Sequence, residues 1–272
     1  MPTSALIVAL TLGSMGAAIP DKAAKEQDEI FQRHWGTEFV WKFDELPTQG
    51  TLPNFRVPYS GYIYPDTAGG TANALAKYDR AYNGGRSLAV AYEKYDTTAY
   101  KQPIKKPLGP FGLFAPRVMG TPDWHGHCNG WAAAAIRHAE PQKAVRVNGV
   151  TFSPADIKAL LAEIYLYNEP EPLAGWDYDV NPGVLHAVMA NWVGRGSHPI
   201  GVEADPGEEK WNYPIYAFSS SSAKRSSRTV EVKMNVAYAK DSNGEYQESP
   251  RIQRTKYFHY MLYLDNYGRI VG

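Results

Sequence analysis

The pattern of apolar and polar residues predicts helices in the first part of the chain. Residues 20–34 are typical of a helix that is solvated over most of its surface, and residues 71–95 form a second helical region, interrupted at residues 83–85. The clearest helix begins after Ser153, which can cap it, with Pro154 in its first turn. Its predicted apolar stripe consists of Ile157, Leu160, Leu161, Ile164 and Tyr165.

Beyond residue 200 the pattern changes to strands. Residues 229–236 alternate with period two, residues 257–264 do so less cleanly, and turn signals lie at residues 241–244 and 265–268. We therefore predict an α+β fold, in which a helical N-terminal part and a cysteine-bearing helix pack on an antiparallel sheet.

The N-terminus carries a short apolar run followed by small residues. Residues 5–12 are too few to span a bilayer, and together with residues 16–18 they are typical of the core and cleavage region of a signal peptide. We predict a signal-peptide remnant over residues 1–19, a helical region over residues 20–108 and a catalytic core over residues 109–272. This organisation predicts a secreted or periplasmic protein.

Charge and cysteine content narrow the function. Lysine plus arginine number 28, as do aspartate plus glutamate, so the net charge is zero. This balance gives no support for binding to nucleic acid, or to a membrane after removal of the signal. The single cysteine excludes an intramolecular disulfide. A lone cysteine is most often a small buried apolar residue, so its surroundings must decide its role.

Those surroundings favour catalysis. Cys128 is predicted to open a short buried helix, because four alanines follow at residues 132–135 and Pro141 ends the segment. At such a position the helix dipole lowers the pKa of a thiol, and free N–H groups of the first turn can stabilise an oxyanion. Gly126 and Gly130 leave room for a substrate backbone. We predict that Cys128 is a nucleophile.

A thiol nucleophile needs a base, and the base needs an acceptor that orients it. Among the seven histidines, His186 enters an apolar run, and Asp205 ends a strand-like run that follows it. We predict that His186 is the base and that Asp205 orients it. His259, on a predicted strand, is the alternative base, because papain-like enzymes place the base on a strand. The other candidates for the orienting role are Asp179, Asn191 and Asn212.

The order Cys128, His186, Asp205 resembles the catalytic core of transglutaminases, which implies a papain/transglutaminase-like core. A closer resemblance is to the secreted transglutaminase-elicitor family of Phytophthora and marine bacteria. Residues 126–133, GHCNGWAA, resemble its nucleophile motif, and residues 210–218, KWNYPIYAF, resemble its elicitor peptide. The N-terminal region of the family is similar to PYSGY at residues 58–62, together with Gly69-Gly70 and Lys77-Tyr78-Asp79.

The resemblance implies a protein-glutamine gamma-glutamyltransferase, or transglutaminase. Cys128 would form a thioester with a glutamine side chain, and His186, oriented by Asp205, would pass protons to the departing ammonia and from the incoming amine. The implied partners are protein substrates bearing Gln and Lys, or small amines. Because the family usually continues with a Gly-Glu-Trp segment beyond this C-terminus, we expect the core to be truncated there.

Two other functions fit the same scaffold. A papain-like cysteine protease or an amidase/deamidase would hydrolyse the thioester, and a non-catalytic elicitor-like protein would keep the fold for binding alone. Trp124, Trp131 and Trp211 are the candidate substrate-binding residues, because they could exclude water while admitting a lysine-like chain. In the elicitor-like alternative, Trp211 and Pro214 would contact a plant receptor.

Neither a metal nor an organic cofactor is expected. His125, His127 and Cys128 lie close together in sequence, but no second cysteine and no His-x-x-x-His pair completes a zinc site. Calcium is common among animal transglutaminases, yet the sequence contains no EF-hand loop that would indicate it.

Overall fold

The computed structural model describes residues 6–9, 18–99, 124–168, 171–174, 180–203, 209–242 and 251–272. Several sequence predictions fall outside these residues, namely Asp205, its alternative Asp179 and the boundary between residues 108 and 109. Most of the predicted signal-peptide remnant and the second half of the turn predicted at residues 241–244 also lie outside them.

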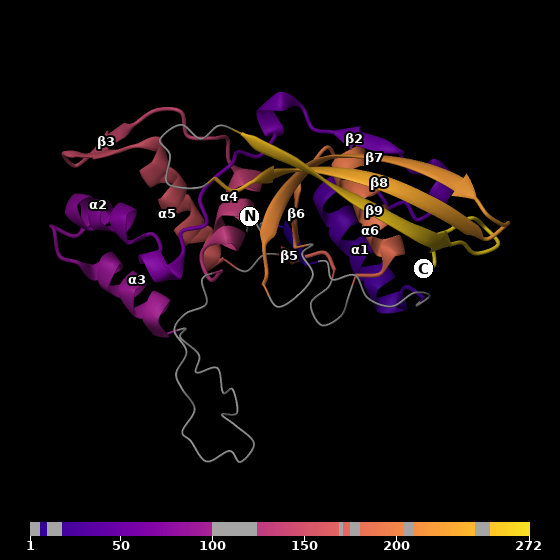
Figure 1. Ribbon diagram of the computed structural model, residues 1–272, viewed down its shortest axis with the longest axis horizontal. Helices are drawn as coiled ribbons and strands as arrows, with labels where there is room; N and C mark the ends of the chain where they lie inside the picture. The colour runs from indigo at the N-terminus through magenta and orange to yellow at the C-terminus, as the bar shows by residue number, and fades with distance from the viewer. Residues whose placement is uncertain are drawn as a thin grey trace, which may run out of the picture.

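A seven-stranded mixed sheet runs through the described structure (Figure 1). Its strands follow the order β5 (Glu171–Pro172), β1 (Leu6–Ala9), β6 (Ile200–Glu203), β7 (Asn212–Lys224), β8 (Thr229–Lys240) and β9 (Ile252–Tyr263), and β2 (Gln49–Thr51) pairs with β7. Strands β6 to β9 are antiparallel, whereas β1 runs parallel to both β5 and β6. Period-two alternation buries one face of β8, through Val230, Val232, Met234 and Val236.

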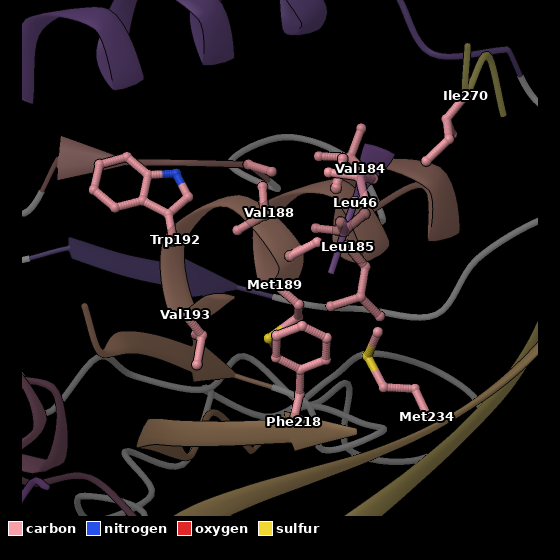
Figure 2. Close-up of a cluster of buried hydrophobic side chains, with 14 of the residues drawn as sticks. Leu46, Val184, Leu185, Val188, Met189, Trp192, Val193, Phe218, Met234 and Ile270 are labelled. Carbon is pink, nitrogen blue, oxygen red and sulfur yellow. The ribbon is translucent and has the colours of Figure 1, made fainter. Parts of the chain in front are cut away.

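The main hydrophobic core lies between this sheet and helices α1 (Asp21–Trp35), α6 (Pro182–Val188) and η4 (Met189–Arg195), the last of which is π-helical. Figure 2 shows Leu185 and Met189 from these helices together with Phe218 and Met234 from the sheet. Each large apolar side chain buried in this way contributes about 1.5–3 kcal/mol to the free energy of unfolding. The core therefore fixes α6 and η4 firmly against the sheet.

A second group of elements lies at the other end of the molecule (Figure 1). It comprises α2 (Ala72–Tyr82), α3 (Leu88–Ala99), α5 (Pro154–Leu166) and the hairpin of β3 (Val145–Val147) and β4 (Val150–Phe152). Helix α4 (Cys128–Arg137) lies between α5 and strands β6 and β7. Single 3₁₀ turns occur at η1 (Phe43–Glu45), η2 (Asn54–Arg56) and η3 (Asp66–Ala68).

Helices α4 and α5 approach each other closely through small residues. A Cβ added at Gly130 would lie 2.1 Å from the Ala162 carbonyl oxygen, so only glycine fits there. The capping box predicted for α5 is present, with Ser153 and Asp156 bonding reciprocally.

The predicted apolar stripe of α5 is only partly buried, with Leu160 packed against the smaller core cluster. Ile164 is 56 % exposed, whereas Ala155, Ala159 and Ala162 are buried, together with Lys158. The physical reason is the close contact with α4, which selects the small face of α5 for burial rather than its larger aliphatic face.

The predicted mixture of helices with an antiparallel sheet is confirmed, including the helix break at residues 83–85. There Asp79 accepts hydrogen bonds from the N–H groups of Ala89 and Val90, which fixes the start of α3. Residues 6–9, from the predicted signal-peptide remnant, form β1. Cleavage of that segment stays a prediction.

We predict that Gly130→Ala will lower the free energy of unfolding by about 2 kcal/mol, because the added methyl group forces the backbones of α4 and α5 apart. Urea unfolding followed by circular dichroism measures the change. Gly149→Ala is the control, since a Cβ there meets nothing within 4 Å and adds only the cost of its positive φ. A Gly130→Ala protein no less stable than this control would contradict the close contact.

Candidate functional site

Cys128 is the first residue of α4, as the sequence predicts. His127 occupies the N-cap position with non-helical φ and ψ angles of −94° and 30°. All residues of α4 from Gly130 to Ile136 are buried, because the alanine-rich helix is enclosed by α5 on one side and by the sheet on the other. The helix therefore fixes the start of its first turn, and the thiol with it.

The Cys128 thiol contacts the beginning of β7. The Asn212 side chain donates from Nδ2 to Sγ at 3.7 Å, and the thiol donates to the Lys210 carbonyl oxygen at the same distance. An amide donor of this kind stabilises a thiolate more than a thiol. Asn212 thus contacts the Cys128 sulfur directly.

Burial dominates the acidity of this thiol. Cys128 is only 6 % exposed, and its burial raises the pKa of the thiol. The backbone and side chain of Asn212 and the backbone of Asn129 oppose this effect, and the charge of Asp241 adds to it. The position at a helix terminus predicts a lowered pKa, whereas in the structure burial is the largest influence on this thiol and raises its pKa.

Cys128 lines a cleft of about 440 Å³ between the α3–α5 region and the start of β7. Its walls are formed by Asp66, Asp96, Trp124, His125, Gly126, His127, Asn129, Leu166, Tyr167, Lys210 and Asn212. Tyr167 donates a hydrogen bond to Asp96 across one wall. The cleft is large enough for an extended side chain.

The structure does not bring His186 to Cys128. His186 lies on α6 in the main core, where Nδ1 is 2.9 Å from the Tyr260 hydroxyl and the ring stacks on Phe43. Burial lowers the pKa of His186 to about 4. The imidazole is therefore a neutral core group in this conformation, and it does not line the cleft.

The alternative base, His259, also lies elsewhere. Its Nε2 is 2.7 Å from Glu231 Oε1 on the neighbouring strand β8, and its side chain is about half exposed. Asn191 accepts from Val40 N–H and donates to the Val40 carbonyl oxygen within the main core. Neither residue lines the cleft that contains Cys128.

Two histidines line the cleft beside Cys128, namely His127, whose imidazole meets Glu93 and Glu163, and His125. The His125 ring packs edge-on against Trp124, with centroids 4.3 Å apart, and the His125 carbonyl oxygen accepts a hydrogen bond from Asp66 N–H. Burial raises the pKa of Asp66, and the charge of His125 opposes this rise. The sequence signal for this pair was weak, since His125 precedes the helix by three residues and Asp66 lies on a remote turn.

The three predicted substrate-binding tryptophans occupy different environments. Trp124 lines the cleft, whereas Trp131 is 1 % exposed and donates from its indole to the Tyr59 carbonyl oxygen. Trp131 is thus a packing residue, held there by the turn of α4 that points away from the cleft. Trp211 follows one cleft residue, Lys210, and precedes another, Asn212, in the sequence. Its indole N–H donates to the Glu209 carboxylate.

Within the described residues, one group of side chains has the arrangement of metal ligands. Glu93, His127 and Glu163 meet behind the cleft wall, with their ligand atoms within 4.8 Å of one another. His127, which also lines the cleft, therefore connects this group to Cys128 along the chain.

The segment around Cys128 is also the part that matches a known family. Residues 117–169 match the family model described as "Transglutaminase elicitor". The resemblance to the transglutaminase elicitor family is confirmed. The match covers the cleft-forming residues from Trp124 to Tyr167, including Cys128.

A solved structure extends the comparison to most of the chain. The fold is similar to that of the GP42 transglutaminase from Phytophthora sojae, with a TM-score of 0.72 and 21 % sequence identity. The alignment covers 94 % of this chain and 86 % of that one. No curated protein matches the sequence. Within the described residues, no helix combines the length and the apolar character needed to cross a bilayer.

We predict that Asn212→Ala will raise the pKa of Cys128 further, because the thiolate loses its side-chain donor. The rate of alkylation by iodoacetamide, measured against pH, should then reach its midpoint at a higher pH than in the parent protein. The chain has one cysteine, so the rate reports Cys128 alone. Asn168→Ala, on the exposed end of α5, is the control. An unchanged or lower midpoint would remove Asn212 from the thiol environment.

Proposed function

We propose that this protein is a transglutaminase, which forms a thioester between Cys128 and a glutamine side chain and transfers the acyl group to an amine. The observation that carries the proposal is the thiol at the start of α4, open to a cleft and contacted by the Asn212 amide. The family match over residues 117–169 and the fold similarity to the GP42 transglutaminase support it.

The proposed reaction begins with transfer of the Cys128 proton to a base. Sulfur then bonds to the glutamine carbonyl carbon, and the resulting oxyanion lies near the N–H groups of the first turn of α4. The Asn212 amide stabilises the charge on sulfur before attack. Ammonia leaves with a proton returned by the base, and an amine then attacks the thioester, breaks the S–C bond and regenerates the thiol.

We propose His125 as this base, since its imidazole shares the cleft with Cys128 and His186 does not. The negative charge of Asp66 interacts with His125, and the Asp66 N–H donates to the His125 carbonyl oxygen. Use of His186 would require the imidazole to leave Tyr260 and Phe43 in the main core. Asp205, for which the sequence predicts the orienting role, lies outside the described residues.

We also propose that the fold contains a papain-like core, which the packing of α4 against β6 and β7 supports. In this proposal the cysteine-bearing helix is held against an antiparallel sheet, and the cleft opens at its N-terminus. We also propose that the protein is secreted, in line with the apolar N-terminal run and the family resemblance.

The family match is the main support for transfer rather than hydrolysis. Trp124, Leu166 and Tyr167 supply the apolar part of the cleft wall and suit an alkyl amine, while most of the other wall residues are polar or charged. A cysteine protease, a deamidase and a non-catalytic elicitor-like protein remain outcomes of the test below.

We expect the protein to incorporate a primary amine into a glutamine-containing substrate such as casein. Mass spectrometry of the product during titration with the amine, with and without added calcium, measures the reaction. Cys128→Ala should reduce incorporation to background while leaving the melting temperature close to that of the parent, because only one sulfur atom is removed. Glutamate in place of glutamine without an amine adduct would indicate a deamidase, and backbone cleavage a protease. No reaction by the folded protein would favour a binding role.

We expect His125→Gln to lower kcat for amine incorporation by about 100-fold or more, as loss of a general base does. His186→Gln should change the melting temperature and leave kcat close to that of the parent, because the His186 imidazole is hydrogen-bonded to Tyr260 in the core. Both variants are compared at the same folded fraction. A loss of kcat in His186→Gln, with His125→Gln fully active, would restore His186 as the base.

A further inference from the structure

Three side chains from separate segments meet beside α4. Glu93 comes from α3, His127 from the N-cap of α4 and Glu163 from α5. His127 Nε2 is 3.7 Å from Glu93 Oε1 and 3.7 Å from Glu163 Oε2. An imidazole nitrogen and two carboxylate oxygens thus converge on one point.

The cluster is deeply buried. The side chains of Glu93 and His127 are 0 % and 2 % exposed, and that of Glu163 is 12 % exposed. Glu93 Oε2 has no hydrogen-bond partner among the described residues. A buried carboxylate oxygen without a partner costs free energy, and a cation or a proton bound to this carboxyl group would remove that cost.

The surrounding backbone is shaped to hold the carboxylates. Thr71 donates from its N–H to Glu93 Oε1 at 2.7 Å and from its hydroxyl to Glu163 Oε2 at 2.7 Å. Gly70 has a φ of +58°, and a Cβ there would lie 1.8 Å from Glu93 Oε1 and 2.9 Å from His127 Cε1. Donors that bond to a ligand's oxygen atoms in this way orient the ligand toward a metal ion.

The charges of the cluster conflict in the absence of a cation. Burial raises the pKa of Glu93 to about 7, with the charge of Glu163 adding to the rise. Burial and the charge of Asp96 raise the pKa of Glu163, while hydrogen bonds with Thr71 and Glu93 lower it. Burial also lowers the pKa of His127 to about 4, so the imidazole is neutral and has a free electron pair to offer. Two carboxylates and one neutral imidazole together suit a doubly charged cation.

We propose that Glu93, His127 and Glu163 bind a divalent transition-metal ion, with zinc as the best fit. Zinc accepts one nitrogen and two oxygen ligands at about 2.0–2.2 Å, which places such ligands 3–4 Å apart, as they are here. Calcium prefers six to eight oxygen ligands and has no preference for imidazole. The Thr71 hydroxyl or a water molecule can complete the coordination.

The ion would hold the start of α4 in place and would take no part in the reaction of Cys128. His127 directly precedes Cys128 and caps α4, so an ion bound to it would tie α3 and α5 to the start of that helix. His127 also forms part of the cleft wall. We therefore assign the ion a positioning role for the thiol, independent of the reaction that Cys128 catalyses.

The test measures binding directly in the full chain carrying Cys128→Ala, so that a thiolate cannot contribute a zinc ligand. The protein is freed of metal with a chelator and titrated calorimetrically with zinc, and separately with cobalt, whose visible absorption reports nitrogen and oxygen ligands. We expect one ion per chain. Glu163→Gln should weaken zinc binding by about 100-fold or more. Loss of a residue that only orients a ligand weakens metal binding by about 10- to 100-fold.

Two further measurements separate a metal ligand from a structural residue. Zinc should raise the melting temperature of the parent but not that of Glu163→Gln. Without zinc, Glu163→Gln should melt at the same temperature or higher, because one of two opposed buried carboxylates is gone. His34→Asn is the control, since it removes an imidazole paired with a single carboxylate, Glu171, and should leave binding unchanged.

The proposal is overturned by any of three results. These are zinc binding that Glu163→Gln leaves intact, binding that His34→Asn abolishes instead, and stoichiometric binding of calcium without binding of zinc. His127→Asn provides a second variant at the nitrogen ligand, and it should lose the visible cobalt spectrum if the variant folds.

Discussion

The close packing of α4 is the constraint on which the rest of the site depends. Gly130 lets this helix touch the backbone of α5 at Ala162, and its run of buried alanines lets the other face rest on the sheet. Larger residues at either contact would displace the first turn, and with it Cys128, Asn129 and the N-cap His127. Small side chains at these contacts bury less apolar surface than larger ones would, but their close packing fixes the position of the thiol.

The electrostatics of Cys128 follow from the same packing. A helix N-terminus and the Asn212 amide favour the thiolate, but enclosure by two layers of structure removes the water that would solvate it. The second effect is larger in this conformation. A reactive thiolate would therefore be formed mainly when a substrate, a base or a small opening of the cleft compensates for the lost solvation.

The sequence predicts well what depends on neighbouring residues. The capping box at Ser153, the helix break at residues 83–85 and the position of Cys128 at a helix start all arise from local backbone chemistry. It predicts poorly what depends on long-range packing. An apolar run around His186 is equally compatible with a base on a rigid element and with a core helix, and Tyr260, which holds it, lies on a distant strand. Similarly, Glu93 and Glu163 meet His127 only after three helices pack together.

Because Cys128 is the single cysteine of the sequence, its thiol also determines how this site can respond to oxidants. A sulfenic acid formed at this position has no second cysteine in the chain with which to condense into a disulfide. Its repair depends on a small thiol that can enter the cleft, and its further oxidation would be irreversible. The burial that limits the reactivity of the thiol therefore also protects it, and the width of the cleft decides which reductants can rescue it.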